Sequence, residues 1–459
     1  MRGGAGTGKT VVAMHRAKYL ADRLAADPAR AGERVLFTTF TTNLAYDIET
    51  NLRTLCPEHL GRPTPRIEVI NLDRWVSQFL KRKKFGRNIA YFGDERERLD
   101  QLWREVFEDR GIPEGLTEEF VRAEWSQVIQ ARGLMTEKSY FKVSRAGRGT
   151  PLDRTKRAAL WAIFSEYRAR MIDAGLAEPD DAYREAVEIL SSEAPNLPYN
   201  AVVVDEAQDM GEQAFRLIRA IVPVRPEGDQ NSIFVVGDAH QRIYGRKASL
   251  TACGINVRGR SRRLRLNYRT SEEIRNWAVS ILEGVQVDDL DEGLDSLSGY
   301  KSVFRGPAPT LVGYSSEDEE VAGLIDWLRD LEHTGTQLAD IGVLVATRFL
   351  SDKIATRMAG AGIATVRLQP SQPDDRSIPG LRISTMHRAK GLEFQAIAIP
   401  FLSHASFPPA AALRAAVDDV DRRNILQQER SLLHVAATRA KRFLRVSWSS
   451  EPSKLLMIS

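Results

Sequence analysis

Cysteine and long apolar runs are what this sequence has least of. Its 459 residues contain two cysteines, Cys56 and Cys253, too few for a disulfide framework and suited to a reducing compartment. No apolar run approaches the roughly 20 residues that a membrane helix needs. The first residues are rich in glycine and do not read as a secretory signal. These absences predict a cytoplasmic protein without a membrane partner.

A strong excess of charge is also absent. There are 65 Lys and Arg residues against 61 Asp and Glu, a formal net charge of +4, which permits a polyanionic partner without requiring one. With 43% hydrophobic residues, a chain of 459 residues has enough apolar surface for two or three domains with cores of their own.

Short apolar runs alternate with amphipathic stretches, a pattern typical of an α/β fold with parallel sheets covered on both faces. The clearest predicted strands are 35–38, 201–204, 233–236, 341–345 and 396–399. Between residues 93 and 180, Glu, Arg, Trp and Leu recur at helical spacing and convincing strands are lacking, which predicts an α-helical insertion. We therefore expect a first α/β domain at 1–92 and 181–261, interrupted by the insertion at 93–180, and a second α/β domain at 262–459.

The start of the chain fits the phosphate-binding pattern G-x-x-x-x-G-K-[ST]. It reads Gly3, Gly4, Ala5, Gly6, Thr7, Gly8, Lys9 and Thr10. Glycines let the main chain turn its N–H groups around the β- and γ-phosphates of a nucleotide. Lys9 supplies a positive charge to the same oxygens, and the Thr10 hydroxyl can bind Mg²⁺. The segment therefore predicts a site for a nucleoside triphosphate and its metal ion.

A second apolar run, 202–204, ends in two adjacent carboxylates, Asp205 and Glu206. At the carboxyl end of a parallel strand, Asp205 can hold Mg²⁺ through water, and Glu206 can deprotonate the water that attacks the γ-phosphate. Alone, this string could equally well be an ordinary strand end. Because a phosphate loop lies upstream in the same chain, the catalytic interpretation is favoured. A third run leads to Gln241, which can hydrogen-bond the γ-phosphate or the attacking water.

Further strings follow in order along the chain. They include Asn-Tyr-Arg at 267–269, His-Arg-Ala-Lys-Gly-Leu-Glu-Phe at 387–394 and Thr-Arg-Ala at 438–440. Together with the phosphate loop and Asp-Glu-Ala-Gln-Asp at 205–209, they resemble the motifs of UvrD/Rep/PcrA-like superfamily 1 DNA helicases over nearly the whole chain outside the insertion. The resemblance implies an ATP-dependent DNA helicase or single-strand translocase of 3′→5′ polarity. It also implies two RecA-like P-loop domains that bind ATP and Mg²⁺ between them.

The resemblance implies roles for individual residues. In the first domain, Lys9 and Thr10 would bind phosphate and Mg²⁺, and Asp205 would complete the metal site. Glu206 would be the catalytic base, and Gln241 would sense the γ-phosphate.

In the second domain, Arg269 and Arg439 resemble the two arginines that neutralise charge in the transition state. The planar guanidinium suits this role because it contacts two phosphate oxygens and stays ionised. Tyr268 would stack on adenine, and Glu393 would contact the ribose.

The expected DNA contacts are Thr39, Phe40, Thr41, Arg246 and His387. The first three resemble the family's first DNA-contact motif, with Phe40 in a base pocket; the alternative for Phe40 is core packing at a strand end. Arg246 stands where the family usually has an aromatic residue that stacks on a base, and a guanidinium can also stack or bind phosphate. His387 would contact the backbone or couple DNA to ATP. The expected partner is therefore single-stranded DNA or its junction with a duplex.

Three further features depart from the family pattern. Only Met1 and Arg2 precede the phosphate loop, so we expect the strand that leads into it to be missing and interpret Met1 as a start inside a longer reading frame. Val11 replaces an arginine that covers adenine, which predicts loose base selectivity. The polar segment 369–380 is too short for the large insertion that relatives carry in the second domain.

Two other functions compete with a DNA motor. A missing strand before the phosphate loop favours a truncated nucleic-acid-binding remnant, or a regulatory partner, with impaired ATPase activity. A third candidate, a P-loop kinase or metabolic ATPase, is excluded because the strings at 267–269 and 438–440 are typical of motors with two RecA-like domains and not of small-molecule kinases. DNA-stimulated ATP hydrolysis distinguishes the motor from the remnant.

Overall fold

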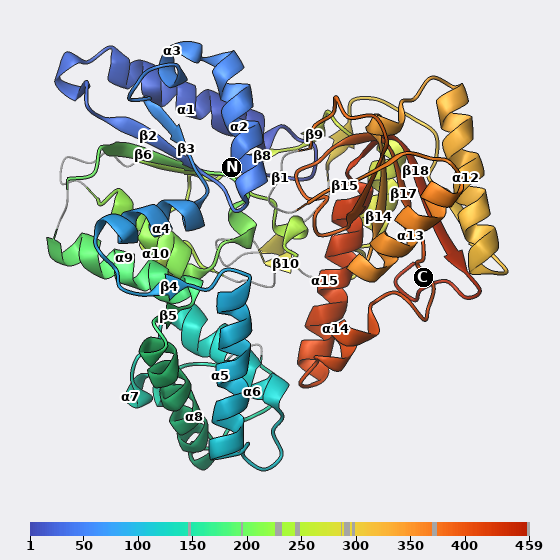
Figure 1. Ribbon diagram of the computed structural model, residues 1–459. Coiled ribbons are helices and arrows are strands. Elements are labelled where there is room, and N and C mark those ends of the chain that lie inside the picture. Colours follow the sequence, from blue (N-terminus) through green and yellow to red (C-terminus); the bar gives the residue numbers. More distant parts are fainter. Residues whose placement is uncertain are drawn as a thin grey trace.

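Two α/β units lie side by side, and a helical unit extends from the first of them (Figure 1). The computed structural model describes residues 1–145, 148–193, 196–224, 232–243, 248–285, 287–288, 294–295, 299–369 and 374–456. None of the helices within these ranges is both long and apolar enough to cross a bilayer.

The first unit is built on a parallel sheet. In spatial order its strands are β3 (Ile67–Val69), β2 (Arg34–Thr38), β6 (Tyr199–Val204) and β7 (Ile233–Val235). One face is covered by α1 (Lys9–Ala25), α2 (Thr42–Leu55) and α3 (Pro57–Leu60), and the other by α4 (Leu72–Arg82), α9 (Pro179–Glu193) and α10 (Glu212–Ile221). Along β2, Val35 and Phe37 pack on the first face and Leu36 on the second, so both faces are buried. The three strands predicted here are confirmed.

A short strand occupies the place where the sequence predicted none. Arg2–Gly3 form β1, which pairs in parallel with β8 (Arg263–Leu264). The Met1 nitrogen donates to the Val235 carbonyl at 2.6 Å, and Arg2 bridges to Gly237 beyond β7. The expected gap is thus partly filled by two residues. The pairing of β8 with β1 also sets residues 263–264 against the first sheet, although they fall in the segment expected to form the second domain.

The second unit is a six-stranded parallel sheet. Its order is β13 (Thr310–Tyr314), β18 (Ala440–Ser449), β17 (Phe394–Ile399), β14 (Ile341–Val345), β16 (Leu381–Thr385) and β15 (Thr365–Arg367). One face carries α12 (Glu317–His333) and α13 (Arg348–Gly360), and the other carries α11 (Glu272–Ser280) and α15 (Asp419–Ala437). A separate pair, β9 (Leu266–Asn267) and β12 (Lys301–Ser302), lies near the first unit, and β10 (Val287–Asp288) pairs with β11 (Leu294–Asp295). The strands predicted at 341–345 and 396–399 are confirmed.

The insertion is helical. It comprises α5 (Asp94–Arg110), α6 (Glu118–Glu124), α7 (Glu137–Lys142) and α8 (Arg154–Asp173), and it is joined to the first unit by the paired strands β4 (Asn88–Ile89) and β5 (Leu176–Ala177). Its core is aromatic: Trp103 stacks on Tyr167 with ring centroids 3.8 Å apart, and Trp125 meets Tyr167 edge-on at 5.1 Å. This local core lets the insertion pack as a compact unit.

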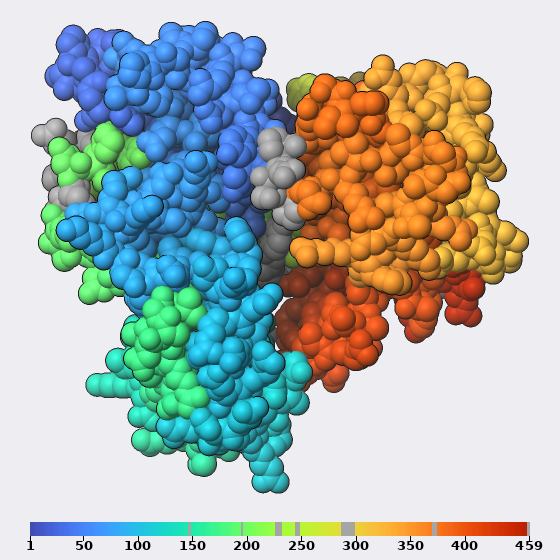
Figure 2. Space-filling model, viewed as in Figure 1, coloured from blue at the N-terminus to red at the C-terminus, as the bar shows by residue number. Residues whose placement is uncertain are grey.

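The insertion also contacts the second unit. The Thr150 main-chain N–H and hydroxyl both donate to one carboxylate oxygen of Asp418, at 2.9 and 3.0 Å. The other Asp418 oxygen accepts the N–H of Asp421 and caps α15. Figure 2 shows the lower end of the second unit lying against the helical insertion. The short helix α14 (Ala410–Arg414) precedes this contact.

Candidate nucleotide site and DNA face

The phosphate loop joins β1 to α1 and folds around the Lys9 side chain. Gly6 and Gly8 adopt left-handed φ values of 71° and 79°, which glycine tolerates. The Lys9 ammonium donates to the carbonyls of Gly3 and Gly4, both at 2.8 Å, and lies 3.7 Å from the Asp238 carboxylate. The lysine charge is therefore held at the centre of the loop with a carboxylate beside it.

The carboxylate pair lies at the carboxyl end of β6, directly against α1. The Thr10 hydroxyl donates to Asp205 Oδ2 at 2.7 Å, and Asp205 is almost fully buried. Burial, with the neighbouring charge of Glu206, raises the pKa of Asp205 to about 6. A hydroxyl and a carboxylate oxygen in contact beside a phosphate loop are the hard oxygen donors that Mg²⁺ prefers. The residues present therefore fit a magnesium ion here.

A second group of possible metal ligands lies far from this loop. Within the described residues, Asp22, Glu58 and His59 bring their ligand atoms within 4.8 Å of one another. The Lys18 ammonium stands 2.8 Å from Asp22 and 3.6 Å from Glu58 and already supplies a cation. This group is an ion-pair cluster rather than a second metal centre.

A chain of hydrogen bonds connects the two sheets. Gln241 donates to Asp238 Oδ2 at 2.7 Å, and the buried Arg439 donates to Gln241 Oε1 at 3.1 Å. Arg439 follows α15, and its Nε also donates to the Val435 carbonyl. Burial lowers the pKa of Arg439 to about 10, so the guanidinium is still protonated at neutral pH. Gln241 and Arg439, each predicted to act in ATP hydrolysis, are thus in direct contact across the boundary between the two units.

Lys390 makes a second bridge that sequence reasoning missed. Its ammonium donates to Asp209 and, at 2.8 Å, to the Gln241 carbonyl, and it lies 3.7 Å from Glu206. Burial alone would raise the pKa of Glu206, but Lys390 and Lys9 outweigh it and lower the pKa. The Glu206 carboxylate is therefore ionised at neutral pH, with the Gln208 amide donating to it. Lys390 and Asp209 both stand inside recognised motifs, which was the available signal.

Arg269 lies opposite the phosphate loop but contacts a carboxylate. Its guanidinium is 2.6 Å from Glu393, whose other oxygen is 3.2 Å from Lys441. The neighbouring Tyr268 donates its main-chain N–H to the Gly6 carbonyl at 2.9 Å, and its side chain is 62% exposed. The predicted ribose and adenine contacts therefore lie next to each other at the mouth of the loop.

These side chains line a cavity of about 650 Å³, within the 300–1,000 Å³ typical of ligand pockets. Both units contribute to its lining: Gly6, Gly8, Val11, Tyr268, Arg269, Phe304, Arg305, Gly306, Pro307, Glu393, Gln395, Lys441 and Arg442. Among the charged residues of this lining, arginine and lysine outnumber the single acidic residue, Glu393. Such a lining suits an anionic ligand with an apolar portion.

The close approach of the loop to the second unit predicts an asymmetric effect of two alanine substitutions. A Cβ at Gly6 would lie 2.2 Å from Asn267 Oδ1 and 2.7 Å from Arg269 Cβ, whereas a Cβ at Gly8 would meet nothing within 4 Å. Both positions have left-handed φ, so both variants are strained, but only Gly6→Ala also clashes. We expect urea unfolding to show a loss of roughly 2–4 kcal/mol for Gly6→Ala and about 1 kcal/mol for Gly8→Ala. Equal losses would mean that the loop stands clear of Asn267.

The expected DNA contacts lie where α2 meets the second unit. Thr39 is fully buried, Phe40 is half-buried, and Thr41 caps α2 through its hydroxyl. A Cβ at Gly391 would lie 3.1 Å from Leu44 in the first turn of α2, which sets the loop that carries the exposed His387 against this helix. The two segments are neighbours, but the buried Thr39 side chain does not reach the surface. Arg246 lies outside the described residues.

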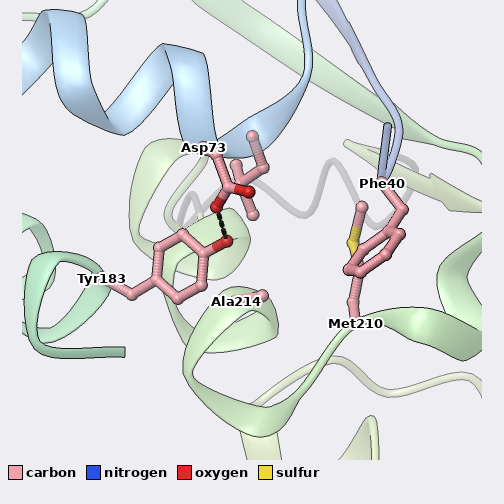
Figure 3. A pocket seen from close by; sticks show the side chains of 6 residues that line it. Phe40, Asp73, Tyr183, Met210 and Ala214 are labelled. Carbon is pink, nitrogen blue, oxygen red and sulfur yellow. Dashed lines mark hydrogen bonds between the residues drawn. The ribbon is translucent and has the colours of Figure 1, made fainter. Parts of the chain in front are cut away.

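The space beside Phe40 is small. A cavity of about 10 Å³, enough for one water molecule, is lined by Phe40, Leu72, Asp73, Tyr183, Met210 and Ala214. Figure 3 shows Met210 beside the Phe40 ring, and the Tyr183 hydroxyl pointing to Asp73, to which it donates a hydrogen bond. In this conformation the cavity is too small for a nucleic-acid base.

Comparison with known proteins identifies the family of the chain. Residues 1–252 match the family described as the UvrD/REP helicase N-terminal domain, and residues 363–451 match the UvrD-like helicase C-terminal domain. The chain is 26% identical over 376 residues to the ATP-dependent DNA helicase UvrD2 of Mycobacterium tuberculosis, covering 79% of this chain and 51% of that protein. It is 23% identical to a probable DNA helicase of Mycoplasma pneumoniae (99% of this chain, 83% of that one) and 24% identical to DNA helicase IV of Escherichia coli (95% and 64%).

The chain thus spans about half the length of the UvrD2 relatives it matches. The family model for the N-terminal domain nevertheless covers more than half of this chain, including the phosphate loop and the carboxylate pair. The chain belongs to the UvrD/REP helicase family.

Proposed function

We propose that the chain is an ATP-dependent DNA helicase or single-stranded DNA translocase of 3′→5′ polarity. The observation that carries the proposal is the direct bond between Arg439 of the second unit and Gln241 of the first, beside Lys9 and the carboxylates. A motor that couples ATP hydrolysis to domain movement needs its catalytic groups divided between two domains in this way. We assign the first RecA-like domain to 1–92 and 181–261, the insertion to 93–180 and the second domain to 262–459.

In the first domain, Lys9 and the loop N–H groups from Gly4 to Gly8 bind the phosphates. Thr10 and Asp205 hold Mg²⁺, which screens the negative charge on the phosphate oxygens. Glu206 accepts the proton of the attacking water, a role supported by its lowered pKa, because only the ionised carboxylate is a base. Gln241 holds that water or the γ-phosphate, since its amide lies between Asp238 and Arg439.

In the second domain, Arg439 and Arg269 stabilise the charge that develops on the phosphate oxygens. Arg439 stays ionised despite its burial. Arg269 exchanges its ion pair with Glu393 for a phosphate, which frees Glu393 to contact the ribose. Tyr268, with its exposed ring at the cavity mouth, stacks on the base.

Nucleotide bound between the domains favours a closed arrangement, and its hydrolysis releases that bridge. DNA that contacts Phe40 and Thr41 on one side and His387 on the other would be gripped in turn by the two domains. Lys390 supports this coupling, because it joins Asp209 and Gln241 of the first unit to the loop that carries His387.

The experiment that tests the proposal is the ATPase rate of the 459-residue chain with and without single-stranded DNA. We expect strong stimulation by DNA. A folded chain that binds DNA but hydrolyses no ATP would support the second candidate instead, a nucleic-acid-binding protein with impaired ATPase activity, for which the two-residue β1 before the phosphate loop is the specific observation. Translocation and its polarity are measured by the displacement of a protein block placed at the 5′ or the 3′ end of single-stranded DNA.

A further inference from the structure

Part of the 650 Å³ cavity is lined by residues that the proposed roles leave unused. Beyond Tyr268, Arg269 and Glu393, its wall is formed by the segment from Phe304 to Pro307 and by Gln395. Both come from the second unit, and the loop lysine, Lys9, is not among the lining residues. Phosphates bound at Lys9 would leave this outer region to the base of the nucleotide.

The segment from Phe304 to Pro307 is held rigidly beside Tyr268. Val303 donates to the Asn267 carbonyl at 3.0 Å, and β12 pairs with β9, the strand that leads into Tyr268. Two carboxylates at the start of α11 fix the rest: Glu272 accepts from the Ser302 N–H at 2.6 Å, and Glu273 accepts from the Gly306 N–H at 2.8 Å. Phe304 is therefore a preorganised, half-buried wall of the cavity that the exposed Tyr268 also lines.

Gln395 is placed to reach the same region. It stands in β17, two residues after Glu393, and both residues line the cavity. Phe394 between them is buried in the core beneath, whereas Gln395 is exposed and lines the cavity. Glu393 is thus adjacent to the proposed ribose position and Gln395 lies one step further along.

We propose that Gln395 reads the edge of the nucleotide base, with Tyr268 and Phe304 against its faces, and that the preferred base is adenine. The inference rests on the proposed nucleotide site and adds its specificity. A carboxamide presents one donor and one acceptor side by side, which matches the N6 amino donor and the N7 acceptor of adenine, whereas guanine presents two acceptors, N7 and O6, on the same edge. Gln395 would thus supply a directional polar group to the base, which Val11, another residue of the cavity lining, does not.

The test compares the affinities of ATP and GTP, measured by displacement of a fluorescent ATP analogue from the full chain. This readout does not need hydrolysis, so its failure is distinct from failure of the proposed ATPase. We expect the wild type to prefer ATP by about tenfold or more, and Gln395→Ala to reduce that ratio by about tenfold. Gln337→Ala, an exposed glutamine of the same unit outside the cavity lining, is the matched control and should leave the ratio unchanged.

Phe304 gives a second, independent readout. Because stacking tolerates any base, Phe304→Leu should weaken ATP and GTP binding by the same factor, about three- to tenfold, and leave their ratio intact. A wild type that binds the two nucleotides equally, or a Gln395→Ala chain with an unchanged ratio, would overturn the assignment of Gln395. A Phe304→Leu chain with undiminished affinity for both nucleotides would remove Phe304 from the base site.

Discussion

A Lys9→Ala chain is expected to lose ATP hydrolysis, by roughly 10³-fold or more, while it keeps most of its affinity for single-stranded DNA. The Lys9 ammonium is the buried cation at the centre of the phosphate loop, within 2.8 Å of two loop carbonyls. Without the Lys9 ammonium, no loop cation of the first domain neutralises the negative charge that develops on the phosphates during hydrolysis. The proposed DNA contacts lie near the start of α2 and do not include Lys9. Steady-state ATPase rates and DNA-binding anisotropy measure the two effects separately.

Lys18→Ala is the matched control for this variant. Lys18 lies on the same helix, α1, and its ammonium pairs with Asp22 rather than facing the cavity. We expect wild-type rates from it. Turnover retained by Lys9→Ala would contradict the assignment of the loop, and joint loss of DNA binding and hydrolysis would indicate misfolding, which circular dichroism detects.

An Arg439→Ala chain should hydrolyse ATP about 10³-fold more slowly and still bind it, because an arginine in the role proposed for Arg439 acts mainly on the transition state. Arg439 is 2% exposed and spans from the Val435 carbonyl to Gln241. Lysine at this position keeps the charge but not the planar fork, so Arg439→Lys should also be slow. Single-turnover hydrolysis with saturating DNA isolates the chemical step from product release.

Arg430→Ala provides the comparison for Arg439. It removes an arginine from α15 that donates to the Glu283 carbonyl at the exposed surface. Rates close to wild type are expected from it. If Arg439→Ala were equally active, the second domain would not complete the catalytic site, and the first domain alone would have to account for hydrolysis.

The residues that sequence could place are those whose roles follow from local pattern. The apolar runs at 35–38 and 341–345 became buried parallel strands because both sheet faces are covered, and the contact of Thr10 with Asp205 follows from two motifs with known chemistry. The β1 strand escaped prediction, since two residues make no hydrophobic pattern and their partners, Arg263 and Leu264, lie far along the chain.

Long-range pairing was beyond the sequence. Lys390 and Asp209 are 181 residues apart, and nothing local indicates that one neutralises the other. The pairing of Arg269 with Glu393 was likewise hidden, because the same motifs suggested a phosphate and a ribose as their partners. Gln395 is a lone polar residue in a strand; only the cavity that it lines gives it significance.

The helix α15 connects the contact with the insertion to the candidate nucleotide site. It has 19 residues and rises about 28 Å, from the Asp418 carboxylate that grips Thr150 of the insertion to the turn that presents Arg439 to Gln241. A rod of this kind has no hinge along its length, so a tilt imposed at the insertion end swings the guanidinium at the other. A displacement of the insertion would therefore change the orientation of the Arg439 guanidinium.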